Sequence, residues 1–194
     1  MMAIDMEQRY NERFNRYVTA LRNGKPDMVP IRPFAAEFTA KYAGMTCQDV
    51  THDYELAFQA MRKCCTDFDW DAVPASMVYV WTGLAQGAGL KYYATPGIDI
   101  SADTAFQFLE PPDDQAFMRA DEYEQLIEDP TGFLLNTWLP RVSKDMSPLG
   151  EACTSKNNLS LLRGGMAMMA YFTAFEPAIE QLKTECGTPS AIAG

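Results

Sequence analysis

Residues 20–38, ALRNGKPDMVPIRPFAAEF, constrain the fold of this chain more than any other stretch. Before them, apolar residues recur at helical spacing from Tyr10 to Leu21, with charged residues between, which predicts an amphipathic helix. Asn23-Gly24 ends that helix, and Pro26-Asp27 turns the chain. The apolar run that follows, over residues 28–38, predicts only a short or irregular strand, because its two prolines are awkward in a central strand.

The next hundred residues predict helices and strands in alternation. We expect a second helix over residues 51–67 and a buried parallel-type strand over residues 69–81, which is a continuous apolar run. This order of elements indicates an α/β fold. Residues 89–97 and 103–112 fit a hairpin better than another strand–helix unit. Beyond them the pattern is helical, near residues 121–128, 132–142, 159–172 and 177–186.

Composition excludes several classes of function. The chain carries 26 acidic and 16 basic residues, a net charge of −10, which argues against nucleic-acid binding. The first twenty residues do not resemble a signal peptide, and no apolar run approaches the roughly 18 residues that span a bilayer. We therefore expect a cytoplasmic protein that does not bind membranes. His52 is the only histidine, which excludes a site built on several histidines. We expect it at the surface, in the first turn of a helix.

The cysteines give no sign of a metal site. The five of them (Cys47, Cys64, Cys65, Cys153 and Cys186) form an odd set without a CxxC pair, so neither a disulfide framework nor a zinc ribbon is indicated. Reduced, mostly buried thiols are the expectation. The methionine-rich stretch LLRGGMAMMAYF, residues 161–172, has two interpretations: an adaptable surface for a partner, or packing in a helical core, which we favour.

Several segments taken together resemble the uroporphyrinogen decarboxylase superfamily. RYVTALRNGKPDMVPI (residues 16–31) is similar to the helix and turn that lead into the first barrel strand of that family. YAGMT, DFDWDAV and GAGLKYYATPG follow in the same order, and the resemblance fades beyond Glu110. It implies the N-terminal part of a (β/α)8 TIM barrel, with a helical extension over residues 1–24 and a helix-rich C-terminal stretch. A full barrel needs about 250 residues, so residues 1–194 are expected to form a single, incomplete domain that is inactive alone.

The resemblance favours one branch of the superfamily. True decarboxylases carry an Arg-Gln-Ala-Gly-Arg-Tyr motif where this chain has RPFAAEFTAKYAG, and an aspartate near the position of Val78. Both departures favour the corrinoid-linked methyltransferases, which move methyl groups between a cobalamin protein and a thiol or folate acceptor. Two alternatives stay open: a divergent uroporphyrinogen decarboxylase, and a non-catalytic half-barrel subunit or interaction module.

The resemblance also sets the expected site, partners and cofactors. Strand ends would aim Glu37, Arg32, Tyr79 and Trp81 at a substrate, while no catalytic residue or metal ligand can be named. The zinc ligands of thiol-accepting members lie in the second half of the barrel, so no cofactor is expected in this chain, and zinc and a corrinoid belong to a complete enzyme. The partners to expect are a small-molecule substrate or a corrinoid protein, and either further copies of this chain or a chain that completes it.

Overall fold

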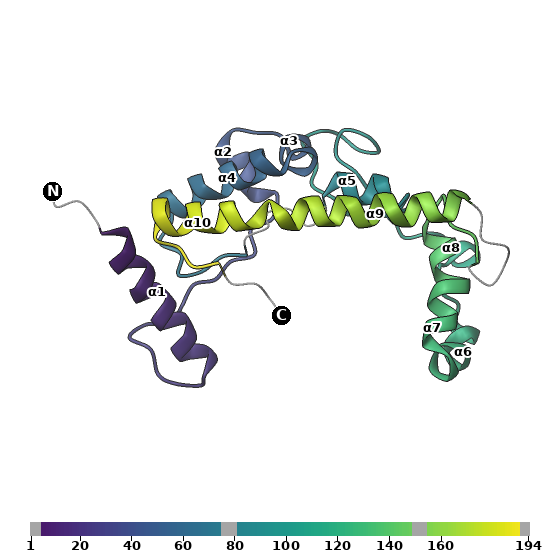
Figure 1. Cartoon of the computed structure of the whole chain (residues 1–194), viewed down its shortest axis with the longest axis horizontal. Coiled ribbons are helices and arrows are strands. Elements are labelled where there is room, and N and C mark those ends of the chain that lie inside the picture. The colour runs from purple at the N-terminus through teal and green to yellow at the C-terminus, as the bar shows by residue number, and fades with distance from the viewer. Residues whose placement is uncertain (1–4, 75–80, 149–154, 191–194) are drawn as a thin grey trace. The chain divides into compact units, whose positions relative to one another are not determined.

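The computed structural model describes residues 5–74, 81–148 and 155–190 (Figure 1). These residues are mostly helical, and their only sheet is one pair of short antiparallel strands. The chain divides into two compact units: Met1–Tyr79 with Tyr171–Gly194, and Val80–Ala170. The prediction of an incomplete TIM barrel is therefore wrong for the part of the chain that the structure describes.

The first unit is a small helical cluster. Its helices are α1 (Met6–Leu21), α2 (Phe38–Ala43), α3 (Cys47–His52), α4 (Tyr54–Asp67) and α10 (Phe175–Cys186). The prediction for α1 is confirmed: Asp5 caps its N-terminus, and Asn23 follows it with a φ of 57°. The expected helix over residues 51–67 is instead α4 preceded by α3, because Asp53 is extended and its side chain caps α4. His52 is exposed, but in the last turn of α3 rather than a first turn.

Helix α4 lies at the centre of this unit and packs against α2, α3 and α10. Its buried side chains repeat at helical spacing: Ala57, Phe58, Ala60, Met61, Cys64 and Cys65. Burial raises the pKa of Cys64 to about 11 and that of Cys65 to about 12. The thiols therefore stay protonated at neutral pH and behave as small apolar side chains, as the sequence predicted for most of them.

The strands expected over residues 28–38 and 69–81 do not form in the described residues. Ile31 O accepts hydrogen bonds from Asp71 N (2.9 Å) and Ala72 N (3.3 Å), and Val73 N donates to Pro189 O (3.1 Å). Val73 also forms a single parallel bridge with Ser190. These pairings do not extend into a ladder. The physical reason lies in prolines 30, 33, 74 and 189, since each removes a backbone donor beside a pairing point. Residues 75–80 of the second expected strand lie outside the described residues.

The second unit begins with a hairpin beside a short helix. Helix α5 (Thr82–Gly87) is followed by β1 (Tyr93–Ala94), which pairs antiparallel with β2 (Gln107–Phe108), so the predicted hairpin is confirmed. The remaining elements are helical: η1 (Asp113–Gln115), η2 (Ala120–Glu122), α6 (Tyr123–Glu128), α7 (Pro130–Phe133), the π-helix η3 (Leu134–Trp138), α8 (Leu139–Val142) and α9 (Ser155–Thr173). Together with α10 of the first unit, they confirm the helical segments predicted after residue 120.

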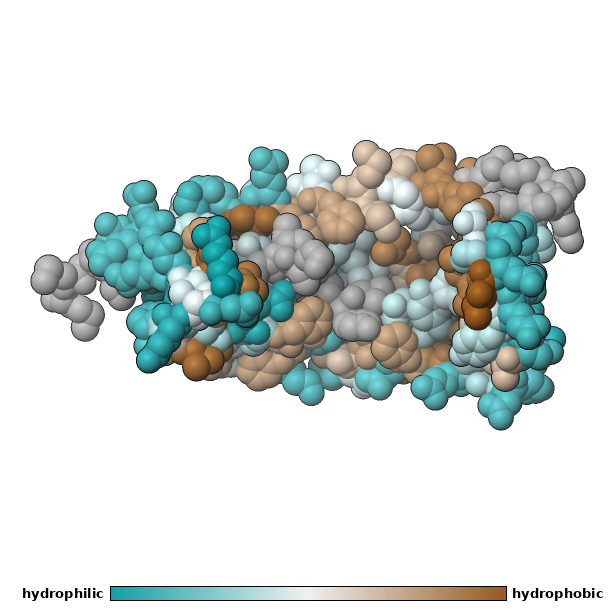
Figure 2. Space-filling view, turned by 90° about the horizontal axis from the view of Figure 1, so that it is seen from below, coloured by the Kyte–Doolittle hydropathy of each residue, from teal (hydrophilic) through white to brown (hydrophobic). Residues whose placement is uncertain are grey.

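Helix α9 corrects one expectation about packing. It approaches α5 closely on one side, where a Cβ added at Gly164 would lie 3.5 Å from Ala88 Cβ. Its leucines and methionines, however, are exposed, including Met166 (63%) and Met169 (71%). The stretch over residues 161–172 is therefore not core, because most of its large apolar side chains are exposed to solvent. Figure 2 shows further apolar side chains, in brown, reaching the surface. No described helix is long and apolar enough to cross a membrane.

Candidate functional site

The structure describes three of the four side chains predicted to bind a substrate, and they belong to two different units. Glu37 is 6% exposed and occupies the N-cap position of α2, while Arg32 is half-buried in the coil before it. Both belong to the first unit. Trp81 precedes α5 in the second unit, and Tyr79 lies outside the described residues. No strand end aims these side chains at a common point, because the expected strands are absent from the part that the structure describes.

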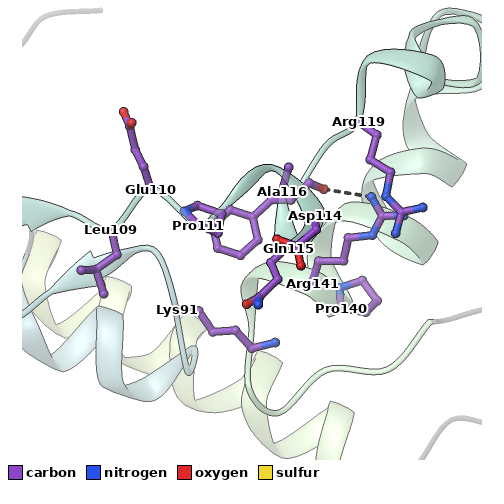
Figure 3. A pocket seen from close by; sticks show the side chains of 11 residues that line it. Lys91, Leu109, Glu110, Pro111, Asp114, Gln115, Ala116, Arg119, Pro140 and Arg141 are labelled. Atoms are coloured by element: carbon purple, nitrogen blue, oxygen red, sulfur yellow. Dashed lines mark hydrogen bonds between the residues drawn. The ribbon is translucent and has the colours of Figure 1, made fainter.

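A pocket of about 570 Å³ in the second unit is a better candidate (Figure 3). Its volume lies within the range of roughly 300–1,000 Å³ that is usual for small-molecule sites. Three cations line it together with prolines, an aromatic ring and two carboxylates. The lining residues are Lys91, Leu109, Glu110, Pro111, Asp114, Gln115, Ala116, Phe117, Arg119, Pro140 and Arg141.

Backbone pairing brings the walls of this pocket together from three distant segments. Lys91 N donates to Val142 O (2.8 Å), and an antiparallel bridge joins the neighbouring Leu90 to Ser143. Leu109 N donates to Tyr92 O (2.8 Å), which continues the β1–β2 hairpin by one residue. Lys91 is therefore held between the segment after β2 and the end of α8, where Arg141 lies.

The π-helix η3 directly precedes α8, which carries Arg141. Pro140 has no backbone N–H, so the regular α-helical pattern cannot run through it. Leu139 N instead donates to Leu134 O, five residues earlier, and such single-turn π segments are frequent at functional sites. Trp138, at the end of η3, lies 6.3 Å from the ring of Tyr92. The aromatic contact thus fixes the end of η3 against the hairpin, just before the pocket wall.

Arg141 is clamped in place by a two-point ion pair. Its Nη1 and Nη2 donate to Glu122 Oε2 (2.8 Å) and Oε1 (2.6 Å), and Nη1 also donates to Phe117 O (3.1 Å; dashed in Figure 3). Arg119 N donates to the same Glu122 Oε2 (2.8 Å). Because planar two-point pairs fix geometry as well as charge, the guanidinium of Arg141 is a preorganised part of the wall.

This ion pair lowers the pKa of Glu122. The hydrogen bonds from Arg141, followed by that from Arg119 N, lower the pKa of Glu122 from 4.5 to about 2. A carboxyl with a depressed pKa stabilises the folded state above pH 4.5 and loses that contribution as the pH falls toward 2. In a carboxyl-detected NMR titration, we expect Glu122 to titrate near pH 2 in the native chain and at a clearly higher pH in Arg141→Gln, where only the bond from Arg119 N still lowers its pKa.

Arg119→Gln is the matched control for this titration. It removes a guanidinium from the same pocket but keeps the backbone N–H that bonds Glu122. The pKa of Glu122 should then stay near 2. A normal titration point for Glu122 in the unmodified chain would contradict the clamp.

The other two cations of the pocket are Lys91 and Arg119. Among the described residues, neither Lys91 nor Arg119 forms an ion pair. Two carboxylates line the pocket, those of Glu110 and Asp114. In Figure 3 the Glu110 side chain points away from the cations, whereas Lys91 extends toward Pro140. Because Glu122 already balances Arg141, the charge left facing the pocket is that of Lys91 and Arg119 against Asp114.

No motif in the sequence predicts this pocket. Its cations stand 28 and 22 residues apart, at positions 91, 119 and 141, in a chain whose overall charge is strongly negative. Each is a single basic residue among acidic and apolar neighbours, without a motif. The one usable signal is Pro140 within a helical stretch, which marks an interrupted helix.

Comparison with known proteins adds no relative. No protein-family model, curated protein or solved structure matches this chain. Among the described residues, no group of three His, Cys, Asp or Glu side chains is placed to hold a metal ion. The site is therefore interpreted from its own chemistry.

Proposed function

We propose that the second unit binds a small organic anion, with a carboxylate or phosphate held by Lys91 and Arg119. The presence of these two cations and the clamped Arg141 in the lining of one pocket carries the proposal. A wall with two cations that form no ion pair among the described residues favours an anion, because each cation can donate a charge-assisted hydrogen bond to it. Phe117, whose ring meets that of Tyr92 edge-on at 6.1 Å, offers an apolar surface to the body of the ligand.

Among the activities that the resemblance implies, this chemistry fits methyl transfer to a folate. A folate combines a flat pterin ring with glutamate carboxylates, so one molecule would use both the aromatic and the cationic wall. Methyl transfer itself stays a prediction, as does the alternative of a divergent decarboxylase, whose substrate is also rich in carboxylates. No catalytic group is assigned for either, and zinc or a corrinoid would have to come from outside the described residues.

The resemblance to the superfamily itself stays a prediction. Two segments that carry it, residues 16–31 and 67–73, are joined by a single network. Arg16 pairs with both Asp27 and Asp71, and Asp71 accepts a hydrogen bond from Ile31 N (2.7 Å). The residues that prompted the comparison therefore have structural roles together. A cytoplasmic location also stays a prediction, which the acidic composition supports.

Titration calorimetry with folic acid tests the proposed binding. We expect saturable binding to the native chain. Lys91→Gln and Arg119→Gln should each weaken it about tenfold, because each removes one charge-assisted hydrogen bond. Lys144→Gln is the matched control, since Lys144 is exposed in the same unit but does not line the pocket. Its affinity should equal that of the native chain.

The possible outcomes distinguish a general anion site from a site that is specific for folate. Binding of phenyl phosphate but not of folic acid, with the same sensitivity to Lys91→Gln, would support the anion site and reject the folate. No heat with either compound would contradict the proposed function. Equal weakening by Lys144→Gln would reduce the effect to general electrostatic attraction and would contradict the pocket.

A further inference from the structure

An apolar face on helix α9 has no function in the pocket described above. It is formed by Leu159, Leu161, Leu162, Met166, Met168 and Met169, which are 45–71% exposed. At 3.6 residues per turn these side chains cover about half of the helix surface, centred opposite the buried Ser160, and Met168 lies beside Gly164 at one edge of this face. A helix that is apolar on its outer side as well as its packed side is normally covered.

We propose that a second copy of this chain covers the α9 apolar face, through a two-fold antiparallel contact of the two α9 helices. Charge is the first argument. The chain carries a net charge of −10, so two copies repel one another over most of their surfaces. Between residues 159 and 173, however, Arg163 is the only charged side chain. This face can therefore meet its own copy without placing acid against acid.

Size and shape agree with this occupant. Six large side chains that are about half exposed offer roughly 600 Å² of apolar surface per copy, near the lower end for specific interfaces. Gly165 lies in the middle of the face, and a Cβ added there would meet no atom within 4 Å. A second helix can thus approach closely at that point. Methionine side chains adapt to the remaining irregular gaps.

Light scattering coupled to size-exclusion chromatography, at micromolar concentration, tests the contact. We expect a particle of twice the chain mass of 21.7 kDa. Met169→Glu should raise the dissociation constant at least about a hundredfold and yield the single-chain mass, because it buries an unpaired charge at the contact. Ile127→Glu is the matched control: Ile127 is 76% exposed on α6 of the same unit, and this variant should remain a dimer.

Several results would overturn the proposed dimer. A native chain that elutes as a monomer, or as an assembly larger than two, overturns the proposal. So does a Met169→Glu variant that keeps its helical circular dichroism and remains dimeric, or an Ile127→Glu variant that dissociates. If Met169→Glu loses its helical signal, Leu162→Lys applies the same test about two turns earlier on the face.

Discussion

Replacing Arg13 by methionine should lower the free energy of unfolding by about 3 kcal/mol, since it removes several buried charge-assisted hydrogen bonds. Arg13 is 2% exposed although it is charged. Its Nη1 donates to the carbonyls of Cys186 (3.1 Å) and Gly187 (3.2 Å) and to Thr188 Oγ1 (2.8 Å). These groups follow the end of α10, where helical carbonyls lack partners. Urea unfolding followed by circular dichroism measures the loss.

Arg9→Met is the matched control for Arg13→Met. Arg9 lies one turn earlier on α1 and also pairs with Asp69, at 3.3 Å against 2.7 Å for Arg13. Its pair is exposed, so its removal should cost less than about 1 kcal/mol. Equal losses in the two variants would contradict the role given to the α10 carbonyls, since only Arg13 bonds them.

Leu182→Ala should destabilise the chain by about 3 kcal/mol, because it leaves a cavity in a packed interface. Leu182 is 2% exposed on α10, which packs against both α1 and α4. Leu21→Ala makes the same chemical change at a site that is 64% exposed at the end of α1. Its effect should stay within about 0.5 kcal/mol. Similar midpoints for the two variants in urea would mean that α10 is not packed as described.

Local sequence signals predicted α1, α4 and the helices after residue 120, but not α2, α3 or α5. Asp5, Asn23-Gly24 and Gly187 mark helix ends by capping and left-handed geometry, which depend on neighbouring residues alone. The hairpin was likewise predicted from turn residues between two short β-like pieces. Such features need no knowledge of distant contacts.

The prediction of the strands was wrong because strands depend on distant residues. An apolar run such as residues 69–81 forms a strand only if a partner supplies a ladder, and that partner lies far away in the sequence. Pro30, Pro33 and Pro74 remove donors where the ladder would continue. Pro30 and Pro33 indicate a short or irregular first strand, and Pro74 acts on the second expected strand in the same way.

The candidate site could not have been predicted from the sequence. Lys91, Arg119 and Arg141 converge only because Lys91 N pairs with Val142 O and because Glu122 clamps Arg141. Neither contact leaves a pattern in the sequence. The prediction that the methionines of α9 pack in a core is wrong. Helical spacing shows which residues share a face, but not whether another element covers that face.

Amide chemical-shift mapping tests the pocket most directly. In a ¹H–¹⁵N spectrum of the native chain titrated with folic acid, the largest shifts should fall on Lys91, Phe117 and Arg119, which line the pocket. Arg32 and Glu37, in the other unit, should not move. Shifts centred on Arg32 and Glu37 with none at Lys91 would contradict the account, as would a spectrum that folic acid leaves unchanged.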